Sequence, residues 1–209
     1  MEKQTTSKQV LPASKEKKEY GGRQRLQDTG PNRFRGPPHL CGMTHIGLLS
    51  DTHGYFDERI AHHLRGCDEI WHAGDFGDAH VVDELQALTA QFRGVYGNID
   101  GTDVRRTQPL VQDFEVEGLR VVITHIGGYP GHYAPAARPL LDATRPGLFV
   151  TGHSHILRVM PDPRRQLLHL NPGAAGRHGF HQVRTLLRFG IEAGKVVNLQ
   201  AVELGKRAG

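Results

Sequence analysis

Hydrophobic positions follow two different spacings along the chain, and together they predict alternating strands and helices after Met43. Short apolar runs indicate strands, whereas apolar residues three or four positions apart, as at Val81, Leu85 and Leu88, indicate a helix with one buried face. The first five expected elements are strand 46–49, helix 57–64, strand 69–72, helix 79–88 and strand 92–96. This βαβαβ order predicts parallel strands joined by right-handed crossovers.

The second half of the chain is richer in strands. Glu117-Gly118 and Ala193-Gly194 each separate two apolar runs, as the turn of a β-hairpin does. The expected strands are 111–116, 119–124, 148–151, 167–170, 185–192 and 196–203. We therefore expect an α/β fold with a single domain over residues 43–209, a length that suffices for a hydrophobic core.

Residues 1–42 differ from the rest of the chain in composition. They are rich in Lys, Gln, Ser, Gly and Pro, and they hold nine basic against four acidic side chains. Because such a segment buries too little apolar surface to offset its conformational entropy, we interpret it as a disordered basic N-terminal extension. A basic arm for nucleic acid is one hypothesis. The preferred alternatives are a targeting extension or a start codon placed too far upstream.

Charge and cysteine content narrow the class of protein. The formal charge is +4, but residues beyond 42 hold 17 basic and 18 acidic side chains, so we expect no nucleic-acid binding by the body. Cys41 and Cys67 do not make a disulfide framework. No apolar run approaches the roughly 20 residues that cross a bilayer, and no secretory signal is evident. We expect a cytoplasmic protein, and association into a homo-oligomer stays open.

Side chains that bind metals follow five of the expected strands. They stand where each strand ends, which is where α/β folds gather their functional sites. The five segments are Asp51-Thr52-His53, Gly74-Asp75, Gly97-Asn98, His125 and Gly152-His153-Ser154-His155. Each segment is a weak signal alone, but all five in this order indicate a metal site.

The types and spacing of these residues indicate the chemistry. In an extended chain, residues i and i+2 project to the same side, so Asp51 and His53 are expected to reach a common centre. The same argument pairs His153 with His155. A mixed set of carboxylate, amide and imidazole ligands suits Mn²⁺, Fe or Zn²⁺, and the absence of a cysteine ligand argues against a structural zinc knuckle. The sequence therefore predicts a catalytic metal site.

The five segments resemble the ordered motifs of calcineurin-like metallophosphoesterases. The short chain and Asn171-Pro172-Gly173 are similar to the compact bacterial and archaeal phosphodiesterase branch, which includes the YfcE-like enzymes and the related eukaryotic retromer subunit. The similarity covers residues 43–204. It implies a four-layer αββα sandwich, in which two mixed β-sheets pack face to face with helices outside.

The resemblance also implies two divalent metal ions, with Mn²⁺ expected and Fe, Zn²⁺ or Ni²⁺ as alternatives. The ligands of the first ion would be Asp51, His53, Asp75 and His155. The ligands of the second would be Asp75, Asn98, His125 and His153. Asp75 would bridge the ions together with a water or hydroxide, and the catalytic residues would be Asp75, Asn98 and His125. Two metals about 3.5–4 Å apart suit phosphoester hydrolysis of a small soluble substrate.

Ile99 departs from the pattern of many relatives, which carry a histidine directly after the asparagine of the third motif. That histidine is thought to protonate the leaving group, and isoleucine cannot donate a proton. The YfcE-like branch often lacks the histidine as well. We therefore expect a preference for phosphodiesters or activated aryl esters, whose leaving groups need less help.

Several further residues have a functional and an ordinary interpretation. Arg177 and His178 could face the metals and bind a phosphate oxygen, or lie on a solvated loop. Asp100 could orient a metal ligand, or be a surface acid. Tyr129 and His132 could border the substrate entrance. His62 and His63 are expected on a helix surface, and His72 is expected to pack or to hydrogen-bond near the site rather than to bind metal. Four further histidines stand at positions that do not indicate chemistry: His45, His80, His169 and His181.

Two other functions compete with hydrolysis of a small diester. A non-catalytic binding scaffold would be favoured by the loss of metal ligands, but every ligand position holds a competent residue. A nuclease would need a basic track beside the metals, and the nearly neutral body argues against one.

Overall fold

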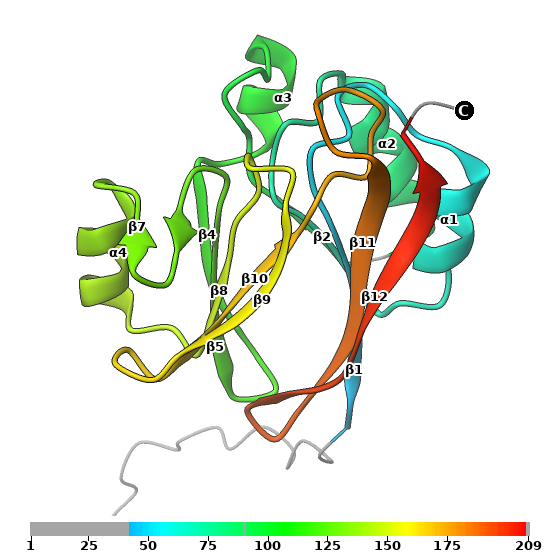
Figure 1. The fold of residues 1–209 in the computed structure, drawn as a ribbon. Helices are drawn as coiled ribbons and strands as arrows, with labels where there is room; N and C mark the ends of the chain where they lie inside the picture. The colour runs from blue at the N-terminus through cyan, green and yellow to red at the C-terminus, as the bar shows by residue number, and fades with distance from the viewer. Residues whose placement is uncertain (1–41, 90, 208–209) are drawn as a thin grey trace, which may run out of the picture. The chain divides into compact units, whose positions relative to one another are not determined.

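The computed structural model describes residues 42–89 and 91–207 (Figure 1). The expected extension over residues 1–42 lies outside this part of the chain, except for its last residue, Gly42. Among the described residues, no helix combines the length and the apolar character that crossing a membrane requires.

The strands form two five-stranded mixed sheets. The first has the order β12-β11-β1-β2-β3 and the second the order β4-β5-β8-β10-β9. The first sheet consists of β1 (Thr44–Leu49), β2 (Glu69–His72), β3 (Gln91–Gly94), β11 (Val183–Glu192) and β12 (Lys195–Lys206). The second consists of β4 (Val111–Val116), β5 (Leu119–Thr124), β8 (Leu148–Val150), β9 (Leu157–Asp162) and β10 (Leu167–Pro172). A separate short pair is β6 (Gly128–Tyr129) with β7 (His132–Tyr133).

The strand pairing confirms the predicted βαβαβ unit and both predicted hairpins. Strands β1, β2 and β3 are parallel neighbours, and helices connect them as expected. Strands β4 and β5 pair antiparallel across the Glu117-Gly118 turn, and β11 and β12 pair antiparallel across Ala193-Gly194. Parallel neighbours end at the same edge of a sheet, so the loops after β1, β2 and β3 are brought together.

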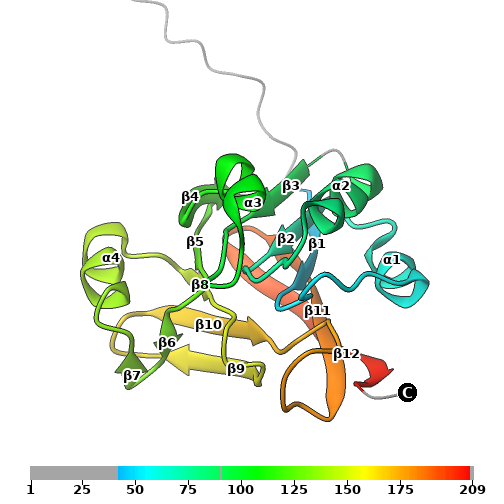
Figure 2. The ribbon, with the colours of Figure 1, turned by 90° about the horizontal axis from the view of Figure 1, so that it is seen from above.

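Helices cover the outer faces of the two sheets, as Figure 2 shows from above. Leu48 of β1 lies in the core between the sheets. Its neighbour Leu49 packs on the outer side with helices α1 (Glu58–Leu64) and α2 (Ala79–Leu88). On the second sheet, Val122 points outward to Leu141 of α4. This alternation follows from the two-residue period of a strand. The helices are α1 (Glu58–Leu64), α2 (Ala79–Leu88), α3 (Thr102–Thr107) and α4 (Ala137–Thr144).

The predicted four-layer αββα sandwich is therefore confirmed. The apolar periodicity did not predict α3, α4, β9 or the β6–β7 pair. Helix α4 has only eight residues and contains Pro139, and β9 is an edge strand with mostly exposed positions. Neither has the continuous apolar pattern from which elements are predicted, because each buries only a few side chains.

His169 provides a test of how the second sheet responds to acid. Its ring is fully buried in β10, and Nε2 lies 2.9 Å from Thr151 Oγ1. Burial, reinforced by the charge of Arg158, lowers the pKa of His169 to about 4. In the unfolded chain a histidine takes up its proton below about pH 6.5. Between pH 6.5 and 4 the unfolded state therefore binds more protons, and stability falls as the pH falls.

Because of His169, we expect the free energy of unfolding to fall by about 3 kcal/mol between pH 7 and pH 4. The figure combines a pKa difference between the folded and unfolded states of roughly two units or more with about 1.4 kcal/mol per pKa unit. Urea unfolding at both pH values, in the wild type and in His169→Gln, measures it. The variant retains a hydrogen-bonding group for Thr151 but does not titrate, so its stability should fall less on acidification. Equal losses in the two proteins would contradict this account.

Candidate metal centre

Most of the predicted metal ligands adopt a strained backbone conformation. Positive φ angles place five of them in the left-handed region: Asp51 (54°), His53 (48°), Asp75 (58°), His153 (66°) and His155 (55°). They account for half of the ten non-glycine residues with positive φ in the described part of the chain. Such a conformation costs of order 1 kcal/mol or more per residue and clusters at functional sites. The backbone of these loops is therefore strained at the five residues whose side chains are predicted to bind metal.

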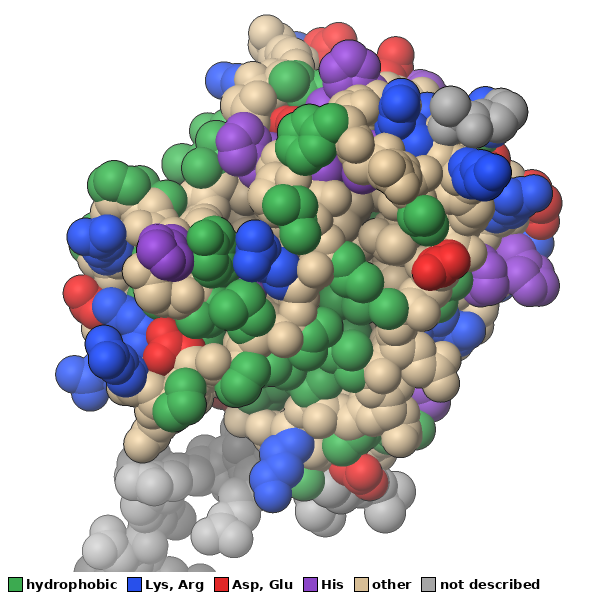
Figure 3. Space-filling model, viewed as in Figure 1, with side chains coloured by type: hydrophobic (Ala, Val, Ile, Leu, Met, Phe, Trp, Pro, Cys, Tyr) green, Lys and Arg blue, Asp and Glu red, His purple; other side chains and the backbone are tan. Residues whose placement is uncertain are grey.

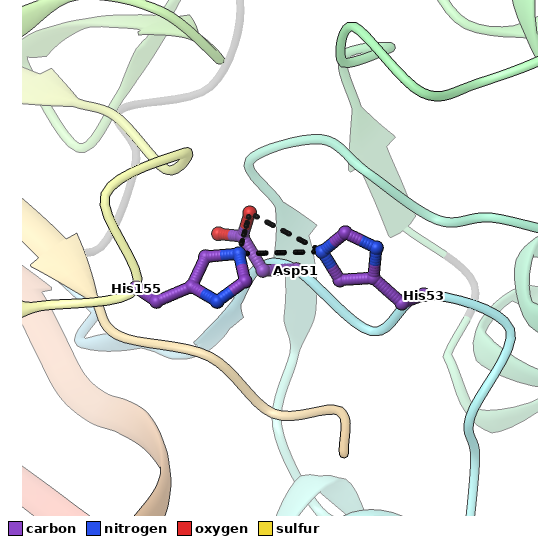
Figure 4. Close-up of side chains that lie close together, drawn as sticks. All are labelled: Asp51, His53 and His155. Atoms are coloured by element: carbon purple, nitrogen blue, oxygen red, sulfur yellow. Dashed lines mark hydrogen bonds and ion pairs between the residues drawn. The ribbon is translucent and has the colours of Figure 1, made fainter. Parts of the chain in front are cut away.

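One group of ligand atoms comes from the ends of β1 and β8 (Figure 4). His155 Nε2 lies 3.1 Å from Asp51 Oδ1 and 3.2 Å from His53 Nε2. His53 Nε2 lies 4.0 Å from the same carboxylate oxygen. Three ligand atoms of two residue types thus surround one point, which suits a single cation of the zinc or manganese type.

A second group comes from the ends of β2, β5 and β8. It contains Asp75, His125 and His153, whose ligand atoms all lie within 4.8 Å of one another. His125 Nε2 is 3.2 Å from Asp75 Oδ1, and the rings of His125 and His153 are 5.3 Å apart between centroids. Asp75 also faces the first group, because its Oδ2 lies 3.8 Å from His53 Nε2. The two groups are adjacent, with Asp75 between them.

His153 and His155 fall in different groups, as the family resemblance implied and contrary to the expectation from their i, i+2 spacing. Residues i and i+2 share a side only in an extended chain. Both histidines have left-handed backbone angles, so the loop that carries them is a tight turn and not an extended segment. The tight turn lets a single loop serve both groups.

Asn98 lies at the edge of the second group. It is exposed, and it lines a pocket together with His125. The guanidinium of Arg105 donates to the Asn98 carbonyl oxygen at 3.3 Å and to the Asp100 carbonyl oxygen at 2.7 Å, which holds this loop. The Asn98 amide is therefore accessible from solvent beside the buried His125 ring.

The tautomer of His125 makes the second group fit a cation. Its Nδ1 lies 2.7 Å from the Ala73 carbonyl oxygen, which can only accept, so Nδ1 carries the hydrogen. In the neutral ring, the lone pair of Nε2 then faces a carboxylate oxygen of Asp75. Two acceptors at 3.2 Å repel each other unless a proton or a metal ion lies between them.

The electrostatics of the site agree with this arrangement. Burial lowers the pKa of His125, but the close Asp75 carboxylate and the charge of Asp51 outweigh burial and raise it. Burial lowers the pKa of His53 by more than the same two carboxylates raise it. Asp51 Oδ1 and His125 Nε2 are among the seven buried side-chain atoms of the described residues that have no hydrogen-bond partner. Buried polar atoms without partners are rare, and a bound cation would satisfy both.

Residues around the ligands fix their positions. Ser50 Oγ donates to Asp51 Oδ2 at 2.5 Å, and the His153 backbone N–H donates to the same oxygen at 3.1 Å. Asn171 Nδ2 donates to the Gly152 carbonyl oxygen at 2.7 Å, so the Asn-Pro-Gly segment braces the loop that carries both histidines. Ser50 carries no signal of this role in the sequence, where Asn171 serves only as a mark of the family branch.

The Asp100 side chain connects the loops after β2 and β3, which carry the predicted metal ligands Asp75 and Asn98. Its carboxylate accepts from the Gly77 backbone N–H at 2.8 Å and from the Gly97 backbone N–H at 2.7 Å, and it is 2 % exposed. The alternative of a surface acid is therefore wrong, because the side chain is buried between the loops after β2 and β3. His72 is fully buried, stacks on Phe76, and lies 3.0 Å from Thr52 Oγ1, in agreement with its expected packing role.

The two residues expected to bind phosphate, Arg177 and His178, contact different neighbours. The His178 ring lies 5.0 Å from the His53 ring, whereas the Arg177 guanidinium lies over the Tyr55 ring at 4.5 Å. Phe180 and His181, which the sequence analysis left without a role, both lie against His155, with ring centroids 5.9 and 5.3 Å away. No sequence signal identifies them, because an exposed aromatic on a turn has no periodicity.

Tyr129 and His132 contact each other across the β6–β7 pair. Their ring centroids are 5.0 Å apart, and the Arg158 guanidinium lies 4.1 Å from the centre of the Tyr129 ring. Tyr129 thus packs against Arg158 of β9, and His132 contacts Tyr129. A role at the substrate entrance stays a prediction for both.

Comparison with known proteins agrees with the site. Residues 44–194 match the family model of the calcineurin-like phosphoesterase superfamily domain. A probable metallophosphoesterase of Methanothermobacter thermautotrophicus is 30 % identical over 139 residues, which cover 62 % of this chain and 76 % of the relative. A phosphodiesterase of Methanocaldococcus jannaschii is 27 % identical over 143 residues, which cover 61 % of this chain and 82 % of the relative.

The fold is also shared with a solved structure of lower sequence identity. Vps29 of Entamoeba histolytica, in a complex with zinc, superposes with a TM-score of 0.60 at 14 % identity and covers 77 % of this chain and 99 % of that chain. This likeness concerns the sandwich alone. The match of the family model over most of the sandwich shows that the chain belongs to the calcineurin-like phosphoesterase superfamily.

Proposed function

We propose that the protein hydrolyses phosphodiester bonds of a small soluble substrate, with two divalent metal ions held by Asp51, His53, Asp75, Asn98, His125, His153 and His155. The observation that carries the proposal is the pair of adjacent ligand groups that meet at Asp75. When bound, two such ions would supply an activated water and would neutralise charge on the phosphoryl oxygens.

The chain's own residues then have defined tasks. The Ala73 carbonyl oxygen holds His125 in one orientation and tautomer through Nδ1, which leaves the Nε2 lone pair facing a metal position beside Asp75. Ser50 and the His153 backbone fix the Asp51 carboxylate, and Asp100 keeps the loops after β2 and β3 at a constant separation. Such preorganisation avoids rearrangement during the reaction, which is where most of the rate enhancement in hydrolysis of this kind arises.

His178 is the best-placed residue for contact with the substrate phosphate. It is exposed, and its ring lies beside His53 at the edge of the first ligand group. Arg177 is held over Tyr55 and would have to leave that ring to reach the same phosphate. We propose His178 as a phosphate contact ahead of Arg177.

Metal reconstitution tests the proposal. After removal of metals by chelation, we expect bis(p-nitrophenyl) phosphate hydrolysis to be lost and to return with Mn²⁺ or with another of Ni²⁺, Fe²⁺ or Zn²⁺. Metal saturation should also stabilise the fold, by about 2.7 kcal/mol for one site at a free concentration 100 times Kd. Thermal unfolding with and without each metal measures the second effect. No turnover with any of the four metals would refute the enzyme.

A non-catalytic scaffold is the second candidate, favoured by the shared fold with zinc-bound Vps29. The two functions separate in the same experiment. A scaffold would be stabilised by metal and yet show no turnover of any diester, whereas the enzyme would show both effects. The relative that is named a phosphodiesterase, and the presence of a competent residue at every ligand position, favour the enzyme.

The absence of a proton donor at position 99 predicts the preference for diesters. The Ile99 backbone N–H donates to Asp75 Oδ1 at 3.1 Å, while its side chain is 46 % exposed beside Asn98. A histidine there would keep the backbone bond and add a general acid, which typically contributes 10²- to 10⁴-fold. We expect Ile99→His to raise turnover of phenyl phosphate, a monoester with a poor leaving group, by at least about tenfold.

Ile99→Asn is the matched control, because it is polar and of similar size but cannot protonate the leaving group. It should leave phenyl phosphate turnover at the wild-type rate. If the asparagine and histidine variants gain equally, polarity rather than proton transfer is responsible and the explanation fails.

A further inference from the structure

A pocket of about 550 Å³ opens directly beside the second ligand group. Asn98 and His125 form part of its wall, so a phosphate at that group would lie at its mouth. The volume lies within the 300–1,000 Å³ that is usual for small-molecule sites. An engineered cavity of about 150 Å³ already binds benzene. The pocket therefore has room for one aromatic ring or for an alkyl chain of several carbons.

The walls of the pocket are chiefly hydrophobic. Leu110, Val111 and Ile126 line it together with Ala137 and Leu140 of α4. Leu110 and Ile126 are 55 % and 47 % exposed, and because both line the same pocket they present adjacent apolar surface to solvent there. Figure 3 shows hydrophobic side chains next to histidines at the upper part of the face it presents. Exposed apolar surface beside a metal site indicates contact with an apolar part of a ligand.

The charge of the pocket suits an anionic head with a hydrophobic tail. Of the described residues, none that lines the pocket is acidic, and Arg105 is the one arginine or lysine. Its guanidinium is held at the edge by the Asn98 and Asp100 carbonyl oxygens and lies 4.9 Å from the centre of the Tyr96 ring. A fixed cation at the mouth complements a phosphate, while the aliphatic wall offers few hydrogen-bond partners to a sugar or a nucleobase.

We propose that this pocket receives a hydrophobic ester group of the substrate, so that the protein favours phosphodiesters with an aryl or alkyl group over diesters of two polar alcohols. The proposal rests on the proposed phosphodiesterase function, since it assigns the pocket to the substrate of the same site. Leu110, Ile126 and Leu140 would then determine specificity, and the fixed Arg105 would supply positive charge near the phosphate.

Alkylphosphonates of increasing length test the pocket without any hydrolysis. They carry an anionic head but no ester bond. Isothermal titration of the Mn²⁺-loaded protein should give a Kd that falls about threefold for each added methylene, or about 200-fold over the five methylenes from methylphosphonate to hexylphosphonate. Methyl NMR of the metal-free protein with hexanol gives a second readout, in which the Leu110, Ile126 and Leu140 signals should shift.

Two variants change the pocket in opposite ways. Leu110→Asn removes apolar wall at an exposed position, and Ala136→Trp fills the pocket from an exposed position at the start of α4. Each should weaken hexylphosphonate binding by about tenfold and leave methylphosphonate unchanged. Val183→Asn is the control, because Val183 is an exposed aliphatic residue on β11 that does not line the pocket.

The outcomes separate this proposal from the function on which it rests. If diesters are hydrolysed but methyl- and hexylphosphonate bind equally, the pocket assignment fails and the phosphodiesterase stands. If the tail strengthens binding but no diester is hydrolysed, the pocket is an apolar site and its occupant is not a substrate. If the tail has no effect and Leu110→Asn instead dissolves a dimer in light scattering, the pocket is an interface between two copies of the chain and the proposal is overturned.

Discussion

Replacing Asp75 by asparagine is expected to lower kcat/KM for bis(p-nitrophenyl) phosphate by about 10³-fold. Asp75 is the residue that faces both ligand groups, with Oδ1 at 3.2 Å from His125 and Oδ2 at 3.8 Å from His53. Asparagine has the same shape but no charge and one fewer acceptor oxygen. Losing the shared carboxylate removes several kcal/mol of charge stabilisation, and each 1.36 kcal/mol corresponds to tenfold in rate.

The metal content of the purified variant should fall together with its activity. Elemental analysis after dialysis should show less than two equivalents of metal in Asp75→Asn. The fold should survive, because the Ile99 backbone N–H that donates to Asp75 Oδ1 can donate to the amide oxygen of asparagine. Circular dichroism and urea unfolding without metal establish this point.

Asp113→Asn provides the matched control. Asp113 is an exposed acid on β4 whose ion pair with Arg120, at 2.8 Å, lies on the surface. Surface ion pairs contribute about 0–1 kcal/mol, so activity and metal content should stay at wild-type values. Wild-type turnover in Asp75→Asn, with two metals still bound, would remove Asp75 from the centre and with it the dinuclear assignment.

Adding one methyl group at Gly97 is expected to lower activity by about 10²- to 10³-fold. A Cβ at this position would collide with Asp75 Oδ1 and would lie 2.5 Å from the Asp75 backbone nitrogen. The backbone of the β2 loop cannot yield readily, so the carboxylate must move away from His125. Displacements of about 1 Å at reacting groups can cost about 10²-fold, and here a metal ligand itself is displaced. The same overpacking should destabilise the fold by about 1–3 kcal/mol.

Gly101→Ala is the control for this experiment. Gly101 lies on the same loop, four residues further on, and a Cβ there would meet no atom within 4 Å. Its φ of −77° is one that alanine adopts freely. Kinetics and urea unfolding of the two variants should therefore diverge, with Gly101→Ala within about 0.5 kcal/mol of the wild type. Equal behaviour of the two alanine variants would show that the close approach of Gly97 to Asp75 has no role in the site.

Much of the fold follows from local pattern. Strands such as 69–72 and 119–124 were expected with their observed bounds, because each is a short apolar run between turn residues. Helix α4 was missed, since its contribution to the core is a narrow apolar stripe that includes Leu141 and follows an exposed alanine cap. A helix this short owes most of its stability to packing against the sheet, and the local sequence does not show that packing.

The buried Arg184 shows a limit of a different kind. It is 1 % exposed and donates to the Ala175 carbonyl oxygen at 2.7 Å and to Asp57 at 3.0 Å. It thereby joins the loop after β10 to the start of α1. A sequence-based expectation places arginine at the surface, because burying its charge is unfavourable without partners. Those partners lie nine and 127 residues away along the chain, and only the fold brings them together.

The sequence by itself determined which residues could bind metal and that they would gather, because polar ligands at the ends of parallel strands must meet at one edge. The i, i+2 spacing of the ligands did not predict how they divide, whereas the family resemblance implied a division with His155 in the first group and His153 in the second. The tertiary structure places them in that way, with Asp75 between the groups and left-handed backbone angles at the ligand loops. The fold also forms the apolar pocket, since Leu110 precedes β4, Ile126 follows β5 and Leu140 lies on α4. Ligand identity is a property of single residues, whereas ligand geometry and pocket shape depend on contacts between distant segments.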